Sequence, residues 1–280
     1  MTTSGEKTDQ FHRTRLILGS DGLSRLQNSQ VMIVGLGAVG SYVVEALSRA
    51  GIGRFRLVDF DKAQLSNINR QLLATHSTLG RPKAELARER ILSINPSAQV
   101  ETRQILVNRE TVATLFEDDW SDPADYVVDA IDTLGPKVAL IEETLRRGAP
   151  LVSSMGAALR VDADLVRFGK LTGVSNCPLA AQLRKRLRRV GVNTDDVDCV
   201  YSPEPIRDAL RAGRKDRTRR RARAAPLPRR TLPARAPAQH PRKPFHNSRN
   251  LRSAPRPRSC PPSRAALTRD APTSRKRPFS

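Results

Sequence analysis

Short apolar runs and amphipathic stretches alternate along residues 31–168 of the chain. An apolar run of four or five residues is typical of a strand that is buried on both faces, whereas apolar positions three or four apart are typical of a helix lying on a sheet. The pattern predicts strands at residues 31–34, 55–59, 99–105, 126–131, 151–155 and 164–168, and helices at 41–50, 82–94, 109–116 and 137–147.

The order of these elements defines the fold class. Strands that alternate with helices of about ten residues form parallel βαβ units with right-handed crossovers. We therefore expect an α/β domain with a Rossmann-like, doubly wound and mostly parallel sheet. This domain would occupy residues 1–212.

Charge and proline content set residues 213–280 apart from the rest of the chain. This segment holds 21 of the 49 Lys and Arg residues, 2 of the 28 acidic residues and 12 of the 20 prolines. The net charge of +21 therefore divides into +19 here and +2 in residues 1–212. Such a segment cannot bury enough apolar surface to offset the entropy lost on ordering, so we expect a disordered, basic C-terminal tail.

Several protein classes are excluded by what the sequence lacks. No stretch approaches the roughly 18 apolar residues that a membrane span needs, and the first residues have no apolar core of a secretory signal. The three cysteines, Cys177, Cys199 and Cys260, are far apart and form no CxxC pair, which argues against a disulfide framework and a thiolate zinc site. We expect a cytoplasmic protein without a structural metal.

A glycine-rich loop follows the first predicted strand. Gly35, Gly37 and Gly40 form a GxGxxG motif before a helix, and the second predicted strand ends at Asp59. In this arrangement the first glycine permits a tight turn, the second lets backbone amides approach a phosphate, and the third allows the helix to pack closely on the sheet. The acid accepts hydrogen bonds from a ribose. The loop predicts a nucleotide site, and by itself it fits a dehydrogenase as well as an ATP-dependent enzyme.

Cationic residues after the second predicted strand favour a triphosphate over a nicotinamide. Asn67, Arg70 and Lys83 follow that strand near the carboxyl edge of the sheet. Two cations there would neutralise charge as a phosphorus–oxygen bond breaks. Asp129 and Asp132 come at the end of the fourth predicted strand, where Mg²⁺ bridging phosphates would sit. Asp132 is equally well placed to cap the next helix.

These motifs together carry a resemblance to a known family. They are Gly35 to Gly40, DFD at 59–61, SNxxRQ at 66–71, GRPK at 80–83 and DAID at 129–132. Over roughly residues 11–212 the chain resembles the adenylating domain of the ubiquitin-activating-enzyme superfamily, which includes the molybdopterin and thiamine biosynthesis adenylyltransferases. Within that superfamily, segments 50–61, 127–141, 177–189 and 197–204 are most similar to the tRNA threonylcarbamoyladenosine dehydratases, which also lack a paired CxxC zinc site.

The resemblance implies ATP and Mg²⁺ as cofactors and a homodimer as the working unit. An arginine near the N-terminus, either Arg13 or Arg15, would reach an ATP site across the dimer interface. The residues that the resemblance assigns to ATP binding are Gly35, Gly37 and Gly40 at the phosphates, Asp59 at the ribose, Asp61 and Gln71 beside them, and Asn67, Arg70 and Lys83 at the triphosphate. Asp132 would hold Mg²⁺, and the implied catalytic residues are Arg70, Lys83 and Asp132.

The activity implied by the resemblance is ATP-dependent cyclisation of a modified adenosine in tRNA. A carboxylate on the threonylcarbamoyl group would attack the α-phosphorus and release pyrophosphate. A nitrogen or oxygen of the same substituent would then close the ring and expel AMP, helped by its proximity. Two alternatives stay open: an adenylyltransferase that activates the C-terminus of a ubiquitin-like sulfur carrier, with a carrier or sulfur-transfer protein as partner, and an inactive RNA-binding protein that acts through its basic tail.

Other residues admit two interpretations each. Cys199 is either a thiolate that accepts an acyl group or a small buried apolar residue. The basic run at 184–189 is either a docking surface for a tRNA backbone or a solvated helix face. We expect His12 and His76 to be structural or solvent-exposed.

The end of the chain departs from the family pattern. After residue 205 the family continues with a loop, an apolar strand and a helix, whereas here arginine- and proline-rich sequence takes over from about residue 213. Loss of those elements would expose a sheet edge and apolar surface. We interpret the tail either as a polybasic arm that gathers RNA or as the product of a shifted reading frame in a GC-rich gene. Translating the neighbouring frames of the coding DNA separates the two.

Overall fold

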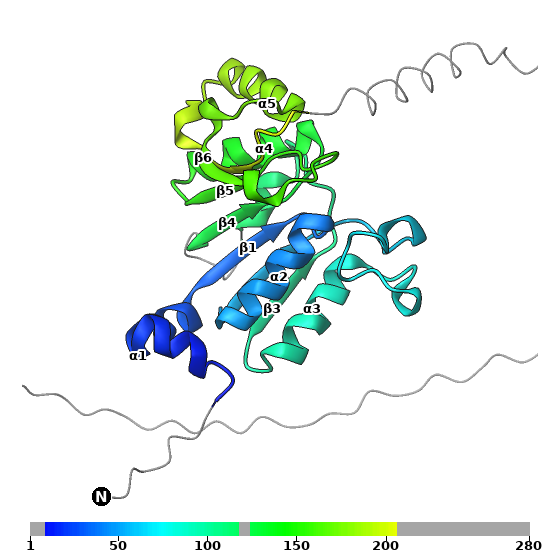
Figure 1. The fold of residues 1–280 in the computed structure, drawn as a ribbon, viewed down its shortest axis with the longest axis vertical. Coiled ribbons are helices and arrows are strands. Elements are labelled where there is room, and N and C mark those ends of the chain that lie inside the picture. The colour runs from blue at the N-terminus through cyan, green and yellow to red at the C-terminus, as the bar shows by residue number, and fades with distance from the viewer. Residues whose placement is uncertain (1–8, 118–123, 206–280) are drawn as a thin grey trace, which may run out of the picture. The chain divides into compact units, whose positions relative to one another are not determined.

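A computed structural model describes residues 9–117 and 124–205 of the chain. The predicted tail at 213–280, and with it both hypotheses for its origin, lies outside these residues. In chain order the helices and strands are α1 (His12–Asn28), β1 (Gln30–Val34), α2 (Ala38–Ala50), β2 (Arg54–Val58), α3 (Lys83–Ile94), β3 (Gln99–Arg103), β4 (Tyr126–Asp129), α4 (Leu134–Arg146), β5 (Leu151–Ser154), β6 (Arg167–Lys170), α5 (Pro178–Arg189) and β7 (Asp198–Tyr201), with short 3₁₀ helices between them (Figure 1).

The strands of the described residues form one sheet in the order β3-β2-β1-β4-β5-β7-β6. Every neighbouring pair is parallel except β6 and β7, which are antiparallel. The chain moves outward from β1 through β2 to β3, and then returns to the other side of β1 with β4 and β5. The predicted doubly wound, mostly parallel sheet is confirmed. The order in which the chain adds strands to the sheet reverses between β1 and β4.

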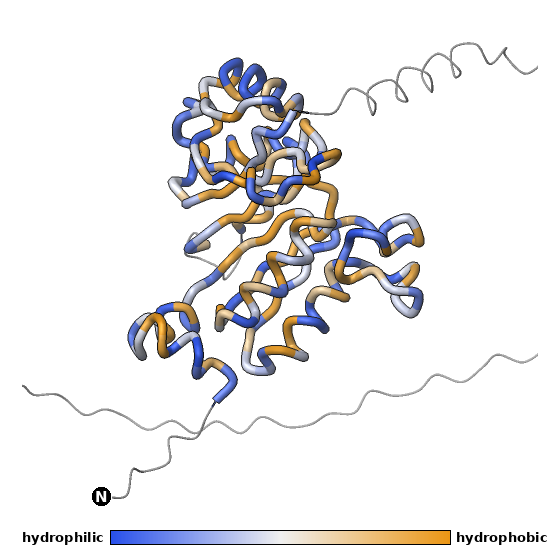
Figure 2. Tube along the Cα trace, viewed as in Figure 1, coloured by the Kyte–Doolittle hydropathy of each residue, from blue (hydrophilic) through white to orange (hydrophobic). Residues whose placement is uncertain are grey.

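The two faces of the sheet are covered by different helices. Side chains alternate along a strand, so Val31 and Ile33 of β1 pack into a cluster with α2 and α3, while Met32 and Val34 pack into a second cluster with α4 and α5. Figure 2 shows β1 as a hydrophobic band between these helices. An uninterrupted apolar run thus marks a strand that is buried on both sides.

Two predicted elements differ from the structure. The helix predicted at 109–116 is a 3₁₀ helix at Val112–Phe116, because the side chain of Asn108 accepts hydrogen bonds from the backbone N–H groups of Glu110 and Thr111 and competes with helix formation. The strand predicted at 164–168 is shifted to β6, since Asp162 caps a 3₁₀ turn just before it.

The hydrophobic pattern did not predict α1 or β7. α1 carries little amphipathic signal, because Leu16 and Ile17 are 64% and 81% exposed, and its backbone is interrupted at Gly19, where φ is 72°. β7 is four residues long and is defined by its pairing with β5 and β6. No helix among the described residues is both long enough and apolar enough to cross a membrane.

Candidate active site

A cavity of about 910 Å³ lies at the carboxyl ends of β1, β2, β4 and β5. This is the point where the strand order reverses, which in doubly wound sheets is the usual place for a ligand. Its volume is in the range of small-molecule and cofactor sites. The sequence-predicted residues that line it are Gly35, Gly37, Asp59, Asp61, Asn67, Arg70, Gln71, Lys83 and Asp132.

The glycine loop connects β1 to the start of α2. Gly35 has a φ of +90°, and a Cβ there would lie 2.8 Å from the carbonyl oxygen of Ala130. Gly37 is the N-cap residue of α2 and lines the cavity, so the positive end of the helix dipole faces the space where a phosphate would bind. Gly40 does not line the cavity. A Cβ on Gly40 would lie 1.8 Å from the carbonyl oxygen of Gly35, so this glycine lets the helix pack on the loop.

Asp59 follows β2 and is almost completely buried. Its carboxylate accepts hydrogen bonds from the backbone N–H of Leu36 (2.7 Å) and of Asp61 (2.8 Å). Burial is the largest influence on its pKa and raises it above the ordinary value, although these hydrogen bonds oppose the shift. Asp59 thus ties the glycine loop to β2, and each oxygen keeps a lone pair for a ligand.

Lys83 and Asp61 are brought together by backbone pairing between two segments. The N–H of Lys83 donates to the carbonyl of Asp61 (3.0 Å), and that of Ala63 donates to the carbonyl of Arg81 (2.9 Å). The Lys83 ammonium then lies 2.9 Å from an Asp61 carboxylate oxygen. Lys83 is buried and Asp61 is 43% exposed, so the pair opens on the cavity.

The glycine loop, Asp59 and the segment between β2 and α3 form what we call the first wall of the cavity, and that segment supplies its other polar groups. Asn67 is buried and its side-chain oxygen accepts from the N–H of Gln64 (3.0 Å), which holds a 3₁₀ turn. Gln71 is buried, with its amide nitrogen 3.6 Å from where a Gly37 Cβ would be. Arg70 is exposed and makes no ion pair within the described residues; its guanidinium donates to the Ser66 carbonyl (2.8 Å) and leaves other N–H groups for an anion.

The two aspartates after β4 have separate environments. Asp129 is fully buried and pairs with Lys137 at 2.8 Å, so it belongs to the core. Asp132 is exposed and lines the cavity. The alternative role as a helix cap is not observed, because Thr133 is the N-cap residue of α4. The described residues contain no group of three side chains that would hold a metal ion on their own.

The opposite wall of the cavity was not predicted. It comes from Ile105 to Val107, from the loop after β5 and from the start of α5. Arg160 in that loop donates from one terminal nitrogen to the Asn176 carbonyl (2.5 Å), while its Nε and other terminal nitrogen are buried and have no hydrogen-bond partner among the described residues. Cys177 is the N-cap of α5, where its sulfur accepts from the N–H of Ala180 (3.4 Å).

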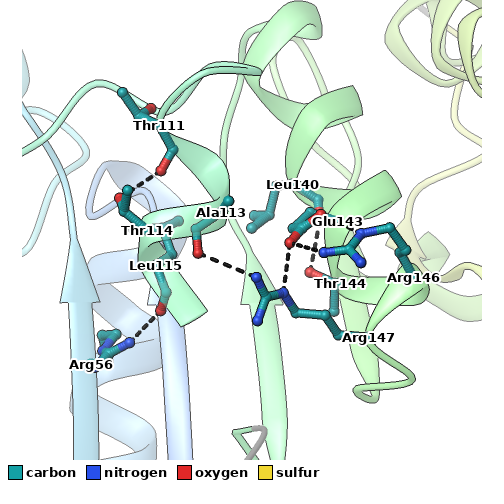
Figure 3. Close-up of polar contacts among 10 residues, drawn as sticks. All are labelled: Arg56, Thr111, Ala113, Thr114, Leu115, Leu140, Glu143, Thr144, Arg146 and Arg147. Atoms are coloured by element: carbon teal, nitrogen blue, oxygen red, sulfur yellow. Dashed lines mark hydrogen bonds and ion pairs between the residues drawn. The ribbon is translucent and has the colours of Figure 1, made fainter. Parts of the chain in front are cut away.

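Polar contacts hold the 3₁₀ helix Val112–Phe116 against the sheet and α4 (Figure 3). Arg56 of β2 donates to the carbonyl of Leu115, and Arg147 donates to the carbonyl of Ala113 at 3.5 Å. Glu143 orients Arg147, with 2.6 Å between its carboxylate and the guanidinium, and that guanidinium also covers the ring of Phe116. None of the residues in these contacts lines the cavity.

Other candidate residues lie away from the cavity. Cys199 is fully buried in β7, and burial raises the pKa of its thiol to about 12, so the thiolate needed for covalent catalysis is not populated at neutral pH. Arg15 pairs with Asp9, and Arg13 is exposed on α1. Neither arginine lines the cavity of its own chain.

Comparison with known proteins agrees with this arrangement. The ThiF family model matches residues 11–200. The chain belongs to the ThiF family. This ThiF-family chain is 40% identical over 195 residues to the tRNA threonylcarbamoyladenosine dehydratase of Bacillus subtilis, covering 70% of this chain and 75% of the relative. It is 37% identical over 203 residues to the enzyme of the same name from Escherichia coli, covering 70% and 74%.

A solved structure resembles the fold of this ThiF-family chain over the same region. It is the E. coli tRNA N6-threonylcarbamoyladenosine dehydratase in complex with ATP, with a TM-score of 0.67 and 37% identity. The match covers 70% of this chain and 82% of that one.

Proposed function

We propose that this chain catalyses the ATP-dependent dehydration of threonylcarbamoyladenosine in tRNA to its cyclic form. The observation that carries the proposal is the similarity in sequence and fold to a dehydratase solved with ATP, in a chain whose nucleotide-site candidates converge on one cavity. We assign the adenylating domain to residues 1–212, and this boundary stays a prediction.

The chemistry consists of two substitutions. The substrate carboxylate attacks the α-phosphorus of ATP, a phosphorus–oxygen bond breaks, and pyrophosphate leaves. A nitrogen or oxygen of the same substituent then attacks the activated carbonyl carbon, loses its proton, and AMP departs. The net change is loss of one water from the nucleoside and hydrolysis of ATP to AMP and pyrophosphate. The second step is favoured because the nucleophile is already attached to the acyl group.

The residues of the first wall fit the first step. The start of α2 at Gly37 would bind a phosphate through backbone N–H groups, and Asp59 would accept hydrogen bonds from the ribose. Lys83 and Arg70 would stabilise the charge that builds on the departing pyrophosphate, since both cations line the cavity. Asn67 would orient the triphosphate.

Mg²⁺ is proposed as the metal of the reaction. Mg²⁺ is commonly held by one or two carboxylates together with the phosphates of a nucleotide. Asp132 fits this requirement, because it is an exposed carboxylate on the cavity wall. The ion would neutralise phosphate charge when bound.

We also propose a homodimer. Leu16, Ile17 and Leu18 on α1 are exposed, and Arg13 lies on the same helix. Burial of this apolar surface against a second copy would bring the arginine toward the partner's site. Sedimentation of the full chain tests the assembly, and a monomer at all concentrations would contradict it.

The deciding experiment is to incubate the full chain with ATP, Mg²⁺ and tRNA that carries linear threonylcarbamoyladenosine, and to weigh the digested nucleosides. Loss of one water that requires ATP and disappears in Lys83→Met is the expected result. Pyrophosphate exchange that depends on a carrier ending in Gly-Gly, with no change in the tRNA, would instead identify a sulfur-carrier adenylyltransferase. RNA binding without ATP binding would identify an inactive RNA-binding protein.

A further inference from the structure

Helix α5 carries five basic residues and no acidic residue. Arg184 is used within the fold, because its guanidinium donates to the carbonyls of Leu171 (3.0 Å) and Val174 (2.8 Å). The other four basic residues are exposed and have no ion-pair partner among the residues described. We call these four, Lys185, Arg186, Arg188 and Arg189, the α5 basic face.

The α5 basic face points away from the core. At about 100° per residue, its four members fall within about 160° of the helix circumference. Leu183 and Leu187 lie on the opposite side and are fully buried in the cluster with α4. The packing of α5 therefore forces its cations into solvent.

Little in the surroundings neutralises this charge. The 3₁₀ helix Thr194–Asp196 packs on α5 and brings Asp195 and Asp196. Asp195 accepts a hydrogen bond from Thr172, and neither aspartate makes an ion pair with the α5 basic face. A cluster of like charges without internal partners is suited to an anionic ligand.

The start of α5 is part of the cavity wall. Cys177, Pro178 and Leu179 line the cavity. With a rise of about 1.5 Å per residue, Lys185 and Arg189 lie about 10 Å and 17 Å further along the helix than Pro178. A nucleoside that enters the cavity while still part of a polymer must lead its backbone out past the cavity wall, and α5 begins in that wall.

We propose that the α5 basic face binds the tRNA phosphates that flank the modified nucleoside. The inference rests on the proposed function, which makes tRNA the substrate. Arginine and lysine side chains bind phosphates without reading sequence and position the nucleic acid for its specific contacts. The α5 basic face would thereby hold the polymer while the cavity takes the nucleoside.

The test replaces Lys185, Arg186, Arg188 and Arg189 together by Gln in the full chain. The matched control replaces Arg25, Arg49, Arg54 and Arg88 by Gln; these are exposed, lie outside the cavity and remove the same charge. Three quantities are measured for each: affinity for unmodified tRNA over a range of salt, KM for modified tRNA, and affinity for ATP. Binding to anionic vesicles is measured in parallel.

We expect the α5 variant to lose at least about tenfold in tRNA affinity and its salt slope to fall by about 3, with ATP affinity unchanged. The control should stay within twofold of the wild type. An equal loss in both variants would overturn the proposal in favour of overall charge, and a loss of vesicle binding alone would overturn it in favour of a membrane surface. If the wild type binds tRNA through α5 without dehydrating it, the proposed function is wrong, but the proposal that the α5 basic face binds tRNA phosphates holds.

A second inference comes from Arg160, which lines the cavity from the loop after β5. Its buried Nε and one terminal nitrogen have no hydrogen-bond partner among the described residues. A buried donor without a partner costs roughly 1–3 kcal/mol, and more when charged. The residue before it, Leu159, has a φ of 67°, which is strained for a branched side chain. Strain and an unsatisfied cation together are typical of a ligand-binding position.

We infer that Arg160 binds an oxyanion of the reaction, either the substrate carboxylate or a phosphate oxygen of ATP. A guanidinium has the planar donor geometry that binds either group through two hydrogen bonds. The role also rests on the proposed function, because it assigns a reactant to this part of the cavity.

The test compares Arg160→Gln and Arg160→Lys with Arg167→Gln, an exposed arginine nearby that lies outside the cavity. A rise of about tenfold in KM for modified tRNA assigns Arg160 to the carboxylate, and a similar loss of ATP affinity without tRNA assigns it to phosphate. Lysine should restore part of either effect. If both quantities stay within twofold for Arg160→Gln, or the Arg167 control changes as much, the inference is wrong.

Discussion

Two lysine–aspartate pairs lie near the carboxyl ends of strands of the same sheet, one after β2 and one after β4, and they differ in their exposure. Lys137 and Asp129 lie 2.8 Å apart and are both 0% exposed. Lys83 and Asp61 lie 2.9 Å apart, but the aspartate is 43% exposed and the pair faces the cavity. The residue types and the distances match, so the two pairs differ in the exposure of the aspartate and in the other hydrogen bonds that each pair makes.

Both members of the buried pair make further hydrogen bonds within the chain. The Lys137 ammonium also donates to the Ile131 carbonyl (2.8 Å), and the Asp129 carboxylate accepts from the Ser153 hydroxyl (2.7 Å) and from the Ile131 N–H (3.1 Å). Lys83, by contrast, donates to Asp61 and keeps donors for a phosphate. Lys137 therefore belongs to the core, whereas Lys83 lines the cavity.

Breaking the enclosed pair should have the largest effect. Lys137→Met leaves Asp129 buried without a counter-charge, so we expect a loss of about 3–5 kcal/mol in the free energy of unfolding, measured by urea denaturation. The double variant Lys137→Met/Asp129→Leu should recover most of that loss. A loss below about 1 kcal/mol in the single variant would show that the enclosed pair is no different from the open one.

The same substitution at the open pair should separate activity from stability. Lys83→Met is expected to lower the rate of ATP-dependent dehydration about 10²- to 10³-fold, because a charge that meets the leaving phosphate is lost. The free energy of unfolding should fall by only about 1 kcal/mol, since Asp61 stays hydrated. Equal effects on rate and stability would remove the distinction between the pairs.

Gly37 and Gly40 offer the same contrast between a residue at the cavity and a residue in the packing, with smaller expected effects. Gly37→Ala adds a methyl group 3.6 Å from the Gln71 side chain, which leaves enough room for the protein to fold. Its ATP affinity should drop about tenfold, because the methyl group would lie where a phosphate approaches the backbone. Gly40→Ala is the control, because its Cβ would lie 1.8 Å from the Gly35 carbonyl oxygen and should lower thermal stability instead. A stable Gly40→Ala protein with weak ATP binding would place Gly40 in the site itself.

The smallest effect concerns Glu143, a buried carboxylate that orients Arg147 toward the 3₁₀ helix Val112–Phe116. Arg146, then Arg147, lowers the pKa of Glu143 below its ordinary 4.5. The stabilisation is therefore present above that value and is lost as pH falls through the lowered pKa. Glu143→Gln should cost about 0.5–1 kcal/mol at pH 7, and its difference from the wild type should shrink as the pH falls through the lowered pKa of Glu143. Urea unfolding at several pH values measures this, and a difference that is constant with pH would contradict it.

Much of the fold and half of the site followed from the amino-acid sequence. Central strands were predictable because a strand buried on both faces needs a continuous apolar run. The first wall was predictable as well, because its groups lie on one stretch of chain, between Gly35 and Lys83, in a known order of motifs. Local sequence determines a turn and the loop that follows it.

Only the tertiary structure decided the rest. Arg160 and Cys177 line the same cavity as the glycine loop, because β5 and α5 lie beside it in the fold, and no local pattern marks them. Burial separates Asp129, which lies in the core, from Asp132, which is exposed on the cavity wall, and it encloses Cys199 within β7. The sequence states which chemical groups a chain possesses. Packing decides which of these groups water and a ligand can reach, because desolvation and hydrogen bonding depend on neighbours that are distant in the chain.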